Sequence, residues 1–330
     1  MKALVYTGPN AVELREEPDP VPGDDEVLVR VEAVGICGSD MHAYHGHDSR
    51  RPAPLVLGHE AAGRIASGPN AGRRVAINPL VSCGACGFCI GGRAHLCRSR
   101  QILSMPPRPG AFAELVRVPA RSLVEVPDHL DLAKAALAEP IAVSYHAVNQ
   151  GARLLARPLS SARCAVLGGG AIGVAAALVL AMQGAADIRL GEPHAARRAT
   201  ASRTGVRCYA PGTADEPAES SVDLVIDAVG AAATRAAASR MVAPGGIIVH
   251  AGLLPGSDGL DIRKITLQEV IVSGTYCYTP VDFREVVAAL AAGRFGALDW
   301  FEERPLREGA QAFRDLDAGA TAAAKIILRP

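Results

Sequence analysis

The chain has 330 residues, and its 34 basic side chains equal its 34 acidic ones, so its formal net charge at pH 7 is zero. A neutral chain is poorly suited to holding a polyanion, which disfavours nucleic acid as a ligand. The sequence has neither an apolar run of membrane-spanning length nor an apolar segment at its start, so we expect a cytoplasmic protein that does not enter a membrane.

The first third of the chain has the pattern of half-buried strands. A chain of 330 residues exceeds the size that one hydrophobic core usually organises, so we expect two domains. Apolar residues at Val27, Val29, Val31 and Ala33 share one face of an alternating segment. Short strand-like pieces broken by proline and glycine continue to about Pro127. This pattern predicts an all-β, barrel-like first unit.

A possible metal site begins where the first alternating strand ends. Cys37 follows that strand, and His59 and Glu60 stand together further along the chain. A lone cysteine is more often a small buried apolar side chain than a ligand. Here a thiolate, an imidazole and a carboxylate are all available to one zinc ion with an open position for a substrate oxygen. The sequence therefore predicts a catalytic zinc site.

A second metal site is predicted in the segment at about 79–100. Its cysteines have the spacing C-x2-C-x2-C-x7-C and are Cys83, Cys86, Cys89 and Cys97. Eight cysteines in 330 residues are too few for a disulfide scaffold, and a redox pair would not explain the third and fourth members. An iron–sulfur cluster also uses thiolates, but the last gap differs from the ferredoxin pattern. Structural zinc is the favoured interpretation.

From about Ala142 the pattern changes to alternating apolar strands and alanine-rich helices, which predicts a parallel sheet with right-handed crossovers. The expected strands are Cys164–Leu167, Ile188–Leu190, Val222–Asp227 and Ile247–His250, with helices up to about Gln183 and over Pro193–Arg203. The tail after Gly274 mixes strand and helix. It ends in a strand over Lys325–Leu328 that can return to the first unit.

A glycine-rich turn lies between the first strand and the first helix of this region. Its sequence is Gly168-Gly-Gly170-Ala171-Ile172-Gly173, a G-x-G-x-x-G pattern that is weak alone and stronger in this context. The glycines permit a tight turn, and the N–H groups at the helix start can hold a pyrophosphate. Glu192, at the end of the next strand, can accept both ribose hydroxyls and would repel a 2′-phosphate, which favours NAD over NADP. Arg197 is placed to stack on the adenine.

Taken together, these motifs resemble the zinc-dependent medium-chain dehydrogenases, the superfamily of alcohol, sorbitol and threonine dehydrogenases. The resemblance covers essentially the whole chain. It rests on Gly35-x-Cys37-Gly-Ser39-Asp40-x-His42, on Gly58-His59-Glu60-x-x-Gly63, on the four-cysteine segment, on Glu139-Pro140 and on the glycine turn. It implies an α/β protein with a GroES-like domain over 1–141 and 277–330 and a Rossmann domain over 142–276.

The resemblance also assigns roles to residues. It places Cys37, His59 and Glu60 on the catalytic zinc, with Glu139 contacting the ion directly or through water, so the inner carboxylate stays open. In the implied proton relay, Ser39 accepts the proton of the substrate alcohol and His42 passes it toward water. Asp40 would orient His59 from behind. The pair Glu139-Pro140 resembles the sequence found at this place in the polyol and threonine branch. The alcohol dehydrogenase branch tends to have a second cysteine at the position of Glu139.

The expected reaction is reversible oxidation of a secondary alcohol of a polyol or sugar alcohol to a ketone with NAD. Substrate contacts are expected among side chains on segments that border the cleft in the family, namely Tyr44, His45, His47, Tyr276 and Tyr278. One alternative is a threonine or amino-alcohol dehydrogenase. Another is a polyol-phosphate dehydrogenase that uses Arg50 and Arg51, although this pair is more typical of a solvated loop. A third, from a different class, is an inactive zinc-bearing structural or nucleic-acid-binding protein.

The chain departs from the family pattern at two places. Cys277 stands where sorbitol dehydrogenases tend to have an arginine, which argues against sorbitol itself as the substrate. The segment Ser67–Gly72 is shorter than is usual in the family. Members of the polyol branch are commonly tetramers or dimers built partly through the edge of the Rossmann sheet. The resemblance therefore implies a homotetramer or homodimer with two zinc ions in each chain.

Overall fold

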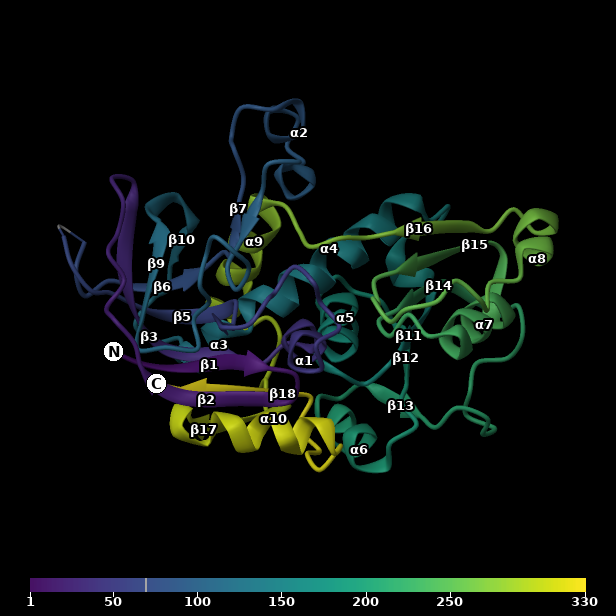
Figure 1. The fold of residues 1–330 in the computed structure, drawn as a ribbon. Coiled ribbons are helices and arrows are strands. Elements are labelled where there is room, and N and C mark those ends of the chain that lie inside the picture. The colour runs from purple at the N-terminus through teal and green to yellow at the C-terminus, as the bar shows by residue number, and fades with distance from the viewer. Residues whose placement is uncertain (69) are drawn as a thin grey trace. The chain divides into compact units, whose positions relative to one another are not determined.

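The computed structural model describes residues 1–68 and 70–330, and the chain divides into two compact units (Figure 1). Residue 69, in the short segment Ser67–Gly72, lies outside the description. The first unit comprises Met1–Glu139, Thr279–Arg294 and Phe301–Pro330, and the second comprises Pro140–Tyr278 and Phe295–Trp300.

The segment Phe295–Trp300 groups with the second unit, whereas the sequence assigned all of 277–330 to the first domain. The structure supplies a reason for this difference. The guanidinium of Arg203, in the second unit, donates to the backbone carbonyl of Asp299 at 3.1 Å. The same guanidinium lies 4.0 Å from the Asp299 carboxylate.

No helix within the described residues combines the length and the apolar character needed to cross a membrane.

The first unit is built mainly of strands. They are β1 (Lys2–Gly8), β2 (Ala11–Glu16), β3 (Glu26–Gly35), β4 (Leu55–Val56), β5 (Glu60–Ile65), β6 (Arg74–Ile77), β7 (Leu80–Val81), β8 (Gln101–Ile102), β9 (Leu115–Pro119), β10 (Leu123–Glu125), β17 (Phe301–Pro305) and β18 (Lys325–Arg329). Its helices are α1 (Gly38–Tyr44), α2 (Gly87–Ile90), α3 (Leu132–Ala136), α9 (Pro280–Ala291) and α10 (Gly309–Asp317).

The main sheet of the first unit brings the end of the chain beside its first long strand. The strand order is β10-β6-β5-β3-β18-β17, and β9 also pairs with β3. Strand β18 runs antiparallel to β3, with Ile327 opposite Gly35, so the predicted return of the C-terminal strand is confirmed. On its other side β3 pairs with β5, where Gly35 lies opposite Glu60. This register holds the segments around Cys37 and His59 next to each other.

Aromatic packing explains why a glycine precedes His59. Gly58 has a φ of +91°, and a Cβ built on it would lie 2.7 Å from the ring of Phe112. Phe112 is itself buried and meets the ring of Phe313, on α10, edge-on at 5.9 Å. A larger residue at position 58 would therefore push the segment carrying His59 away from the core.

The second unit is an α/β structure with a parallel sheet. Its strands are β11 (Arg163–Leu167), β12 (Asp187–Gly191), β13 (Arg207–Tyr209), β14 (Val222–Asp227), β15 (Val242–His250) and β16 (Ile271–Gly274). The helices of this region are α4 (Ala138–Leu154), which starts at the boundary, α5 (Ala171–Met182), α6 (Ala195–Arg203), α7 (Ala232–Met241) and α8 (Ile262–Leu267). The predicted alternation of strands and helices, and the predicted fold class, are confirmed.

The strand order of the second unit locates its ligand-binding edge. The order β13-β12-β11-β14-β15-β16 reverses between β11 and β14, which is the arrangement of a Rossmann fold. In such sheets, ligands bind beyond the carboxyl ends of the strands, at the point of reversal. Gly168 directly follows β11, and Glu192 directly follows β12. Both predicted cofactor elements therefore stand at the edge where the fold binds ligands.

Candidate active site and metal centres

Three predicted ligands converge in the first unit and form what we call the catalytic cluster: Cys37, His59 and Glu60. Their ligand atoms all lie within 4.8 Å of one another. Sulfur, imidazole nitrogen and carboxylate oxygen are the donors that zinc binds in proteins. Glu139, buried at the start of α4, does not belong to this group.

The space around Glu60 fits a cation. A Cβ on Gly35 would lie 2.1 Å from Glu60 Oε2, so only a glycine opposite Glu60 leaves room for the carboxylate. Oε2 is buried and has no hydrogen-bond partner among the described residues. Leaving a buried carboxylate oxygen unsatisfied is costly. A metal ion held by Cys37 and His59 would satisfy it.

The other oxygen of Glu60 is held by a lysine that sequence reasoning missed. Lys325 Nζ donates to Glu60 Oε1 at 2.7 Å and to the Ile36 carbonyl at 2.9 Å. The two side chains are 3% and 1% exposed. Burial lowers the pKa of Lys325, but the negative charges of Glu60 and Cys37 outweigh this effect and raise it, so the lysine stays charged. Glu60 therefore offers one oxygen to the cluster. A lysine that begins the otherwise apolar run Lys325–Leu328 was the available signal.

A buried carboxylate supports His59 from behind. Asp40 Oδ1 lies 3.6 Å from His59 Nδ1 and accepts the Gly58 N–H at 3.3 Å, while Oδ2 accepts the Cys37 N–H at 2.9 Å. Burial raises the pKa of Asp40, but the His59 ring, the Arg51 guanidinium and the Cys37 N–H together outweigh burial and lower it. One carboxylate thus braces both ligand segments. A carboxylate beside Nδ1 favours the tautomer protonated there, which leaves Nε2 available to a metal.

The two expected relay residues share helix α1. Ser39 and His42 are three residues apart, so their side chains lie on the same side of the helix. Both side chains are partly exposed. Burial, followed by the charges of His45 and His47, lowers the pKa of His42. At neutral pH its ring is therefore neutral and able to accept a proton.

The structure separates the substrate candidates. Tyr44 is buried in the core, with its ring 5.3 Å from that of Phe313, which makes it a packing residue. His45 Nε2 is paired with Asp317 Oδ1 at 2.7 Å, and His47 is exposed. After β16, Tyr276 is partly exposed and Tyr278 is fully buried.

The adjacent arginines Arg50 and Arg51 also differ. Arg50 is exposed and binds Asp48 at 2.8 Å, as expected for a solvated loop. That interpretation is wrong for Arg51, which is 3% exposed and hydrogen-bonded to other groups of the protein. The difference depends on tertiary contacts that two adjacent arginines do not reveal.

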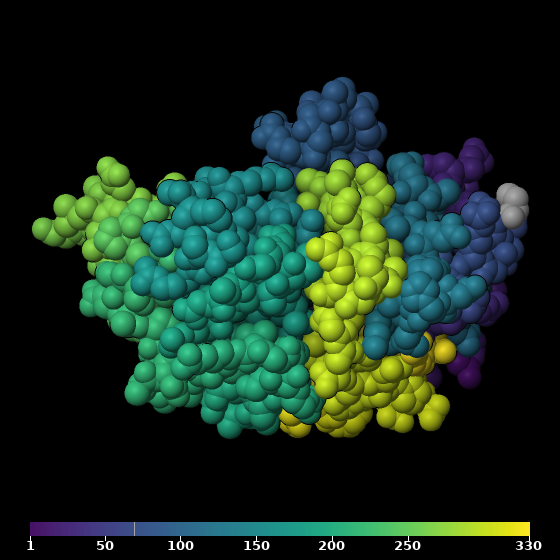
Figure 2. All heavy atoms as spheres, turned by 180° about the vertical axis from the view of Figure 1, so that it is seen from behind, coloured from purple at the N-terminus to yellow at the C-terminus, as the bar shows by residue number. Residues whose placement is uncertain are grey.

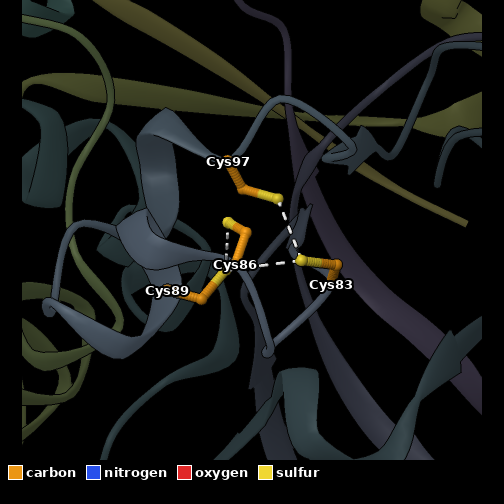
Figure 3. A group of neighbouring side chains, drawn as sticks. All are labelled: Cys83, Cys86, Cys89 and Cys97. Atoms are coloured by element: carbon orange, nitrogen blue, oxygen red, sulfur yellow. Dashed lines mark hydrogen bonds between the residues drawn. The ribbon is translucent and has the colours of Figure 1, made fainter.

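The four cysteines of the second predicted metal site point toward one another (Figure 3). Their sulfurs lie 3.8 Å apart for Cys83 and Cys89, and 3.5 Å apart for Cys86 and Cys89 and for Cys97 and Cys83. Sulfurs placed tetrahedrally about 2.3 Å from a zinc ion are about 3.8 Å apart. Backbone N–H groups of Ala85 and Cys86 lower the pKa of Cys83 to about 6. The set therefore fits a zinc ion, on a lobe that stands out from the first unit (Figures 1 and 2).

The glycine turn of the second unit lets helix α5 pack closely against the backbone of the turn. Gly168 has a φ of +102° and donates its N–H to the Gly191 carbonyl at 2.8 Å. A Cβ on Gly173 would lie 1.8 Å from the Gly168 carbonyl oxygen, so α5 packs directly against the turn. Gly170 caps α5 and faces open space. Ala171 and Ile172 form the first turn of the helix.

Glu192 bridges the glycine turn and the start of α6. Its Oε2 accepts the Gly169 N–H at 2.8 Å, and its Oε1 accepts the His194 N–H at 2.7 Å. Arg197 is partly exposed on α6. The neighbouring Arg198 is also partly exposed and donates to the Glu192 carbonyl at 2.8 Å. The Glu192 carboxylate is thus held where strands β11 and β12 end.

Two family models match the chain: the alcohol dehydrogenase GroES-like domain over residues 23–128 and the zinc-binding dehydrogenase domain over residues 171–292. The chain therefore belongs to the zinc-binding dehydrogenases, and its relatives place it in their polyol branch. It is 31% identical to the L-galactonate-5-dehydrogenase of Escherichia coli K12 over 310 residues, which cover 90% of this chain and 89% of the relative.

It is also 36% identical to the sorbitol dehydrogenase of Bacillus subtilis over 214 residues, covering 62% of this chain and 59% of that protein. Among solved structures, it resembles a zinc-binding dehydrogenase from Sinorhizobium meliloti 1021 bound to NADP. The TM-score is 0.90 at 29% identity, and the match covers 100% of this chain and 99% of the other. The predicted class of enzyme is confirmed, and these relatives speak against the inactive alternative.

The ion pair between Lys325 and Glu60 generates a test of stability. Replacing Lys325 with Met leaves a buried carboxylate without its cation and should cost about 3–5 kcal/mol of unfolding free energy. Arg329, on the same strand, forms partly exposed ion pairs, so Arg329→Met should cost at most about 1 kcal/mol. Urea unfolding of the metal-free protein measures both changes. Equal small losses would show that Glu60 does not depend on Lys325.

Proposed function

We propose that this protein reversibly oxidises a secondary hydroxyl group of a polyol or sugar acid to a ketone and transfers the hydride to NAD. The observation that carries the proposal is the catalytic cluster, in which a cysteine sulfur, an imidazole and the Glu60 carboxylate converge and one buried oxygen of Glu60 has no hydrogen-bond partner among the described residues. Relatives named for L-galactonate and for sorbitol support a hydroxyl-rich substrate.

Two zinc ions bind each chain in this proposal. Cys37, His59 and Glu60 hold the first, which when bound makes the substrate hydroxyl more acidic. Glu60 is the inner carboxylate, and Glu139 stays outside the ligand set. Support comes from the ligand atoms of Cys37, His59 and Glu60, which lie within 4.8 Å of one another in a group that does not contain Glu139. The four cysteines of the lobe hold the second ion, which is structural because protein ligands fill all its positions.

Ser39 and His42 carry the proton. Ser39 Oγ accepts the proton of the substrate hydroxyl while it gives up its own, and His42 receives a proton and releases it to water. A ring whose pKa lies below the ordinary value for histidine is a competent acceptor at neutral pH. Asp40 keeps the ligand segment in register with the helix that carries both relay residues, since it lies on that helix and binds the Cys37 and Gly58 N–H groups.

Glu192 makes the second unit selective for NAD. Its carboxylate is held by the N–H groups of Gly169 and His194, at the end of β12. A ribose can donate its hydroxyls to this carboxylate, whereas a 2′-phosphate would be repelled. Arg197, partly exposed on α6, would stack on the adenine of the bound cofactor. The NADP in the Sinorhizobium meliloti structure is a property of that protein.

Tyr276 and His47 are the remaining candidates for substrate contacts, since the first is partly exposed and the second exposed. We further place the enzyme in the cytoplasm. Within the described residues no cysteine forms a disulfide, which fits a reducing compartment.

The enzyme assembles through the edge of its Rossmann sheet. Strand β16 ends the sheet order and lies near α8 (Figure 1). Around this edge, large apolar side chains are exposed: Leu253, Ile262, Leu267, Ile271 and Val272. An apolar edge strand is a template for pairing with another chain, and a second copy of the same strand can pair with it about a two-fold axis.

A panel of polyols, sugar acids and simple alcohols tests the proposed reaction. With NAD, hydroxyl-rich secondary alcohols should produce NADH absorbance, and elemental analysis should find two zinc ions per chain. Cys37→Ser should abolish turnover and remove one zinc ion with little loss of stability. Cys97→Ser should remove the other ion and lower the melting temperature. A protein that reduces NAD with none of these alcohols is not the proposed enzyme.

Cofactor choice depends on Glu192. Glu192→Ala should weaken NAD binding and leave NADP binding unchanged or stronger, because the negative charge is removed from the ribose site. Fluorescence titration with NADH and NADPH measures both dissociation constants. Arg198→Ala is a control for changes in the shape of the turn. Parallel losses for the two cofactors would mean that Glu192 does not contact the ribose.

The relay predicts different effects of Ser39→Ala and His42→Ala. Ser39→Ala should be the more severe change, since Ser39 alone meets the reacting oxygen. His42→Ala should lower kcat about a hundredfold at neutral pH and recover partly at high pH or with added imidazole. Because the pKa of His42 is lowered, wild-type activity should fall only as the pH drops below about 6.5. Near-normal turnover by Ser39→Ala would refute the relay.

The edge strand predicts the assembly state. Light scattering should give a mass two or more times the 34.1 kDa of one chain, and Ile271→Lys should reduce this mass. Val281→Lys, at an exposed apolar position on α9, should leave the mass unchanged. A mass of 34.1 kDa for the unaltered protein would contradict the proposal.

A further inference from the structure

Arg51 is a buried cation close to the proposed relay that has no part in the chemistry described above. It lies between α1 and β4, and 3% of its surface is exposed. Its acidic partner is Asp48, whose Oδ2 lies 2.7 Å from Arg51 Nη1. Hydrogen bonds from Arg50, opposed by partial burial, lower the pKa of Asp48 to about 2. The ion pair therefore persists across the pH range in which enzymes are assayed.

The rest of the guanidinium is directed at two serines. Nη2 donates to Ser39 Oγ at 3.4 Å, and Nη1 donates to the Ser39 carbonyl at 3.3 Å. On its other edge, Nε donates to the Ser104 carbonyl at 3.1 Å. Ser104 is fully buried, has a φ of +67°, and places its Oγ 3.4 Å from His59 Nδ1. One side chain thus connects the relay serine to the segment behind a proposed zinc ligand.

We propose that Arg51 is a positioning residue that sets the direction of the Ser39 hydroxyl. This inference rests on the proposed function, in which Ser39 accepts the substrate proton. A guanidinium has hydrogen-bond donors only and stays protonated in proteins. A serine hydroxyl accepts two hydrogen bonds and donates one. Because Arg51 occupies one acceptor site of Ser39 Oγ and cannot accept in return, the hydroxyl proton must point elsewhere.

This arrangement leaves Ser39 with the groups that a relay needs. Its second acceptor site is available to the substrate hydroxyl, and its own O–H is available to donate onward. The bond from Arg51 to the Ser39 carbonyl fixes the backbone of the same residue, so both ends of the serine are held. A charged donor also stabilises the negative charge that develops on Oγ as its proton leaves. Arg51 therefore contributes by orienting Ser39, and correct orientation of reacting groups lowers the activation barrier.

The test compares variants of Arg51 with one of its neighbour. Arg51→Met removes the donors and keeps an apolar stem, Arg51→Lys keeps the charge without the planar fork, and Arg50→Gln removes the neighbouring charge that binds the same aspartate. With a neutral polyol and saturating NAD, Arg51→Met should lower kcat about 10- to 100-fold with little change in KM. Arg51→Lys should recover part of the rate. Arg50→Gln should match the wild type.

A double-mutant cycle separates positioning of Ser39 from a general structural role. If Arg51 acts through Ser39, Arg51→Met should add little to the loss caused by Ser39→Ala. The same fractional loss in both backgrounds would overturn the proposal. So would a loss of zinc from Arg51→Met in proportion to its loss of rate. Failure of the proposed function is distinguishable, because the wild type itself would then oxidise no alcohol.

A structural readout tests the inference without turnover. The crystal structure of zinc-loaded Arg51→Met should show Ser39 Oγ in more than one rotamer, with Cys37, His59 and Glu60 in place. A single unchanged Ser39 rotamer would overturn the proposal, whatever the kinetics show.

Discussion

The buried ion pair of Lys325 and Glu60 is the interaction on which the catalytic cluster depends. It joins the last strand, β18, to the first residue of β5 across the intervening strand β3. A buried carboxylate needs a compensating charge, and the lysine supplies it at one oxygen only. The second oxygen has no hydrogen-bond partner among the described residues and is available to an ion held with Cys37 and His59. Pairing of three strands therefore determines both where Glu60 lies and how many donors it offers.

Around this pair, two glycines and a buried carboxylate hold the ligand segments in place. Glycines at positions 35 and 58 leave room for the Glu60 carboxylate and the Phe112 ring, respectively. Asp40 then ties the ligand segments together through their N–H groups. The ligands are consequently held by contacts made before any ion binds, which reduces the ordering required on binding.

The two candidate metal sites differ in how they are built. The lobe brings four sulfurs together within one short segment, so its shape follows from local turns and ligand spacing. The catalytic cluster instead draws on β3 and β5 and depends on the whole sheet. The catalytic cluster therefore lies in the body of the unit, where neighbouring strands resist distortion. A closed site can stand on a projecting lobe.

Short-range patterns in the sequence were enough to predict the cysteine lobe, the glycine turn with Glu192, the alternation of the second unit and the fold class. In each case the partners are close in sequence, or their spacing follows from one strand, turn and helix. Tertiary structure alone decided that Lys325 reaches Glu60, 265 positions away, that Arg51 is buried beside Ser39, and that Tyr44 belongs to the core. These outcomes depend on which strands pair and in which register. Periodicity within one segment carries no information about that choice.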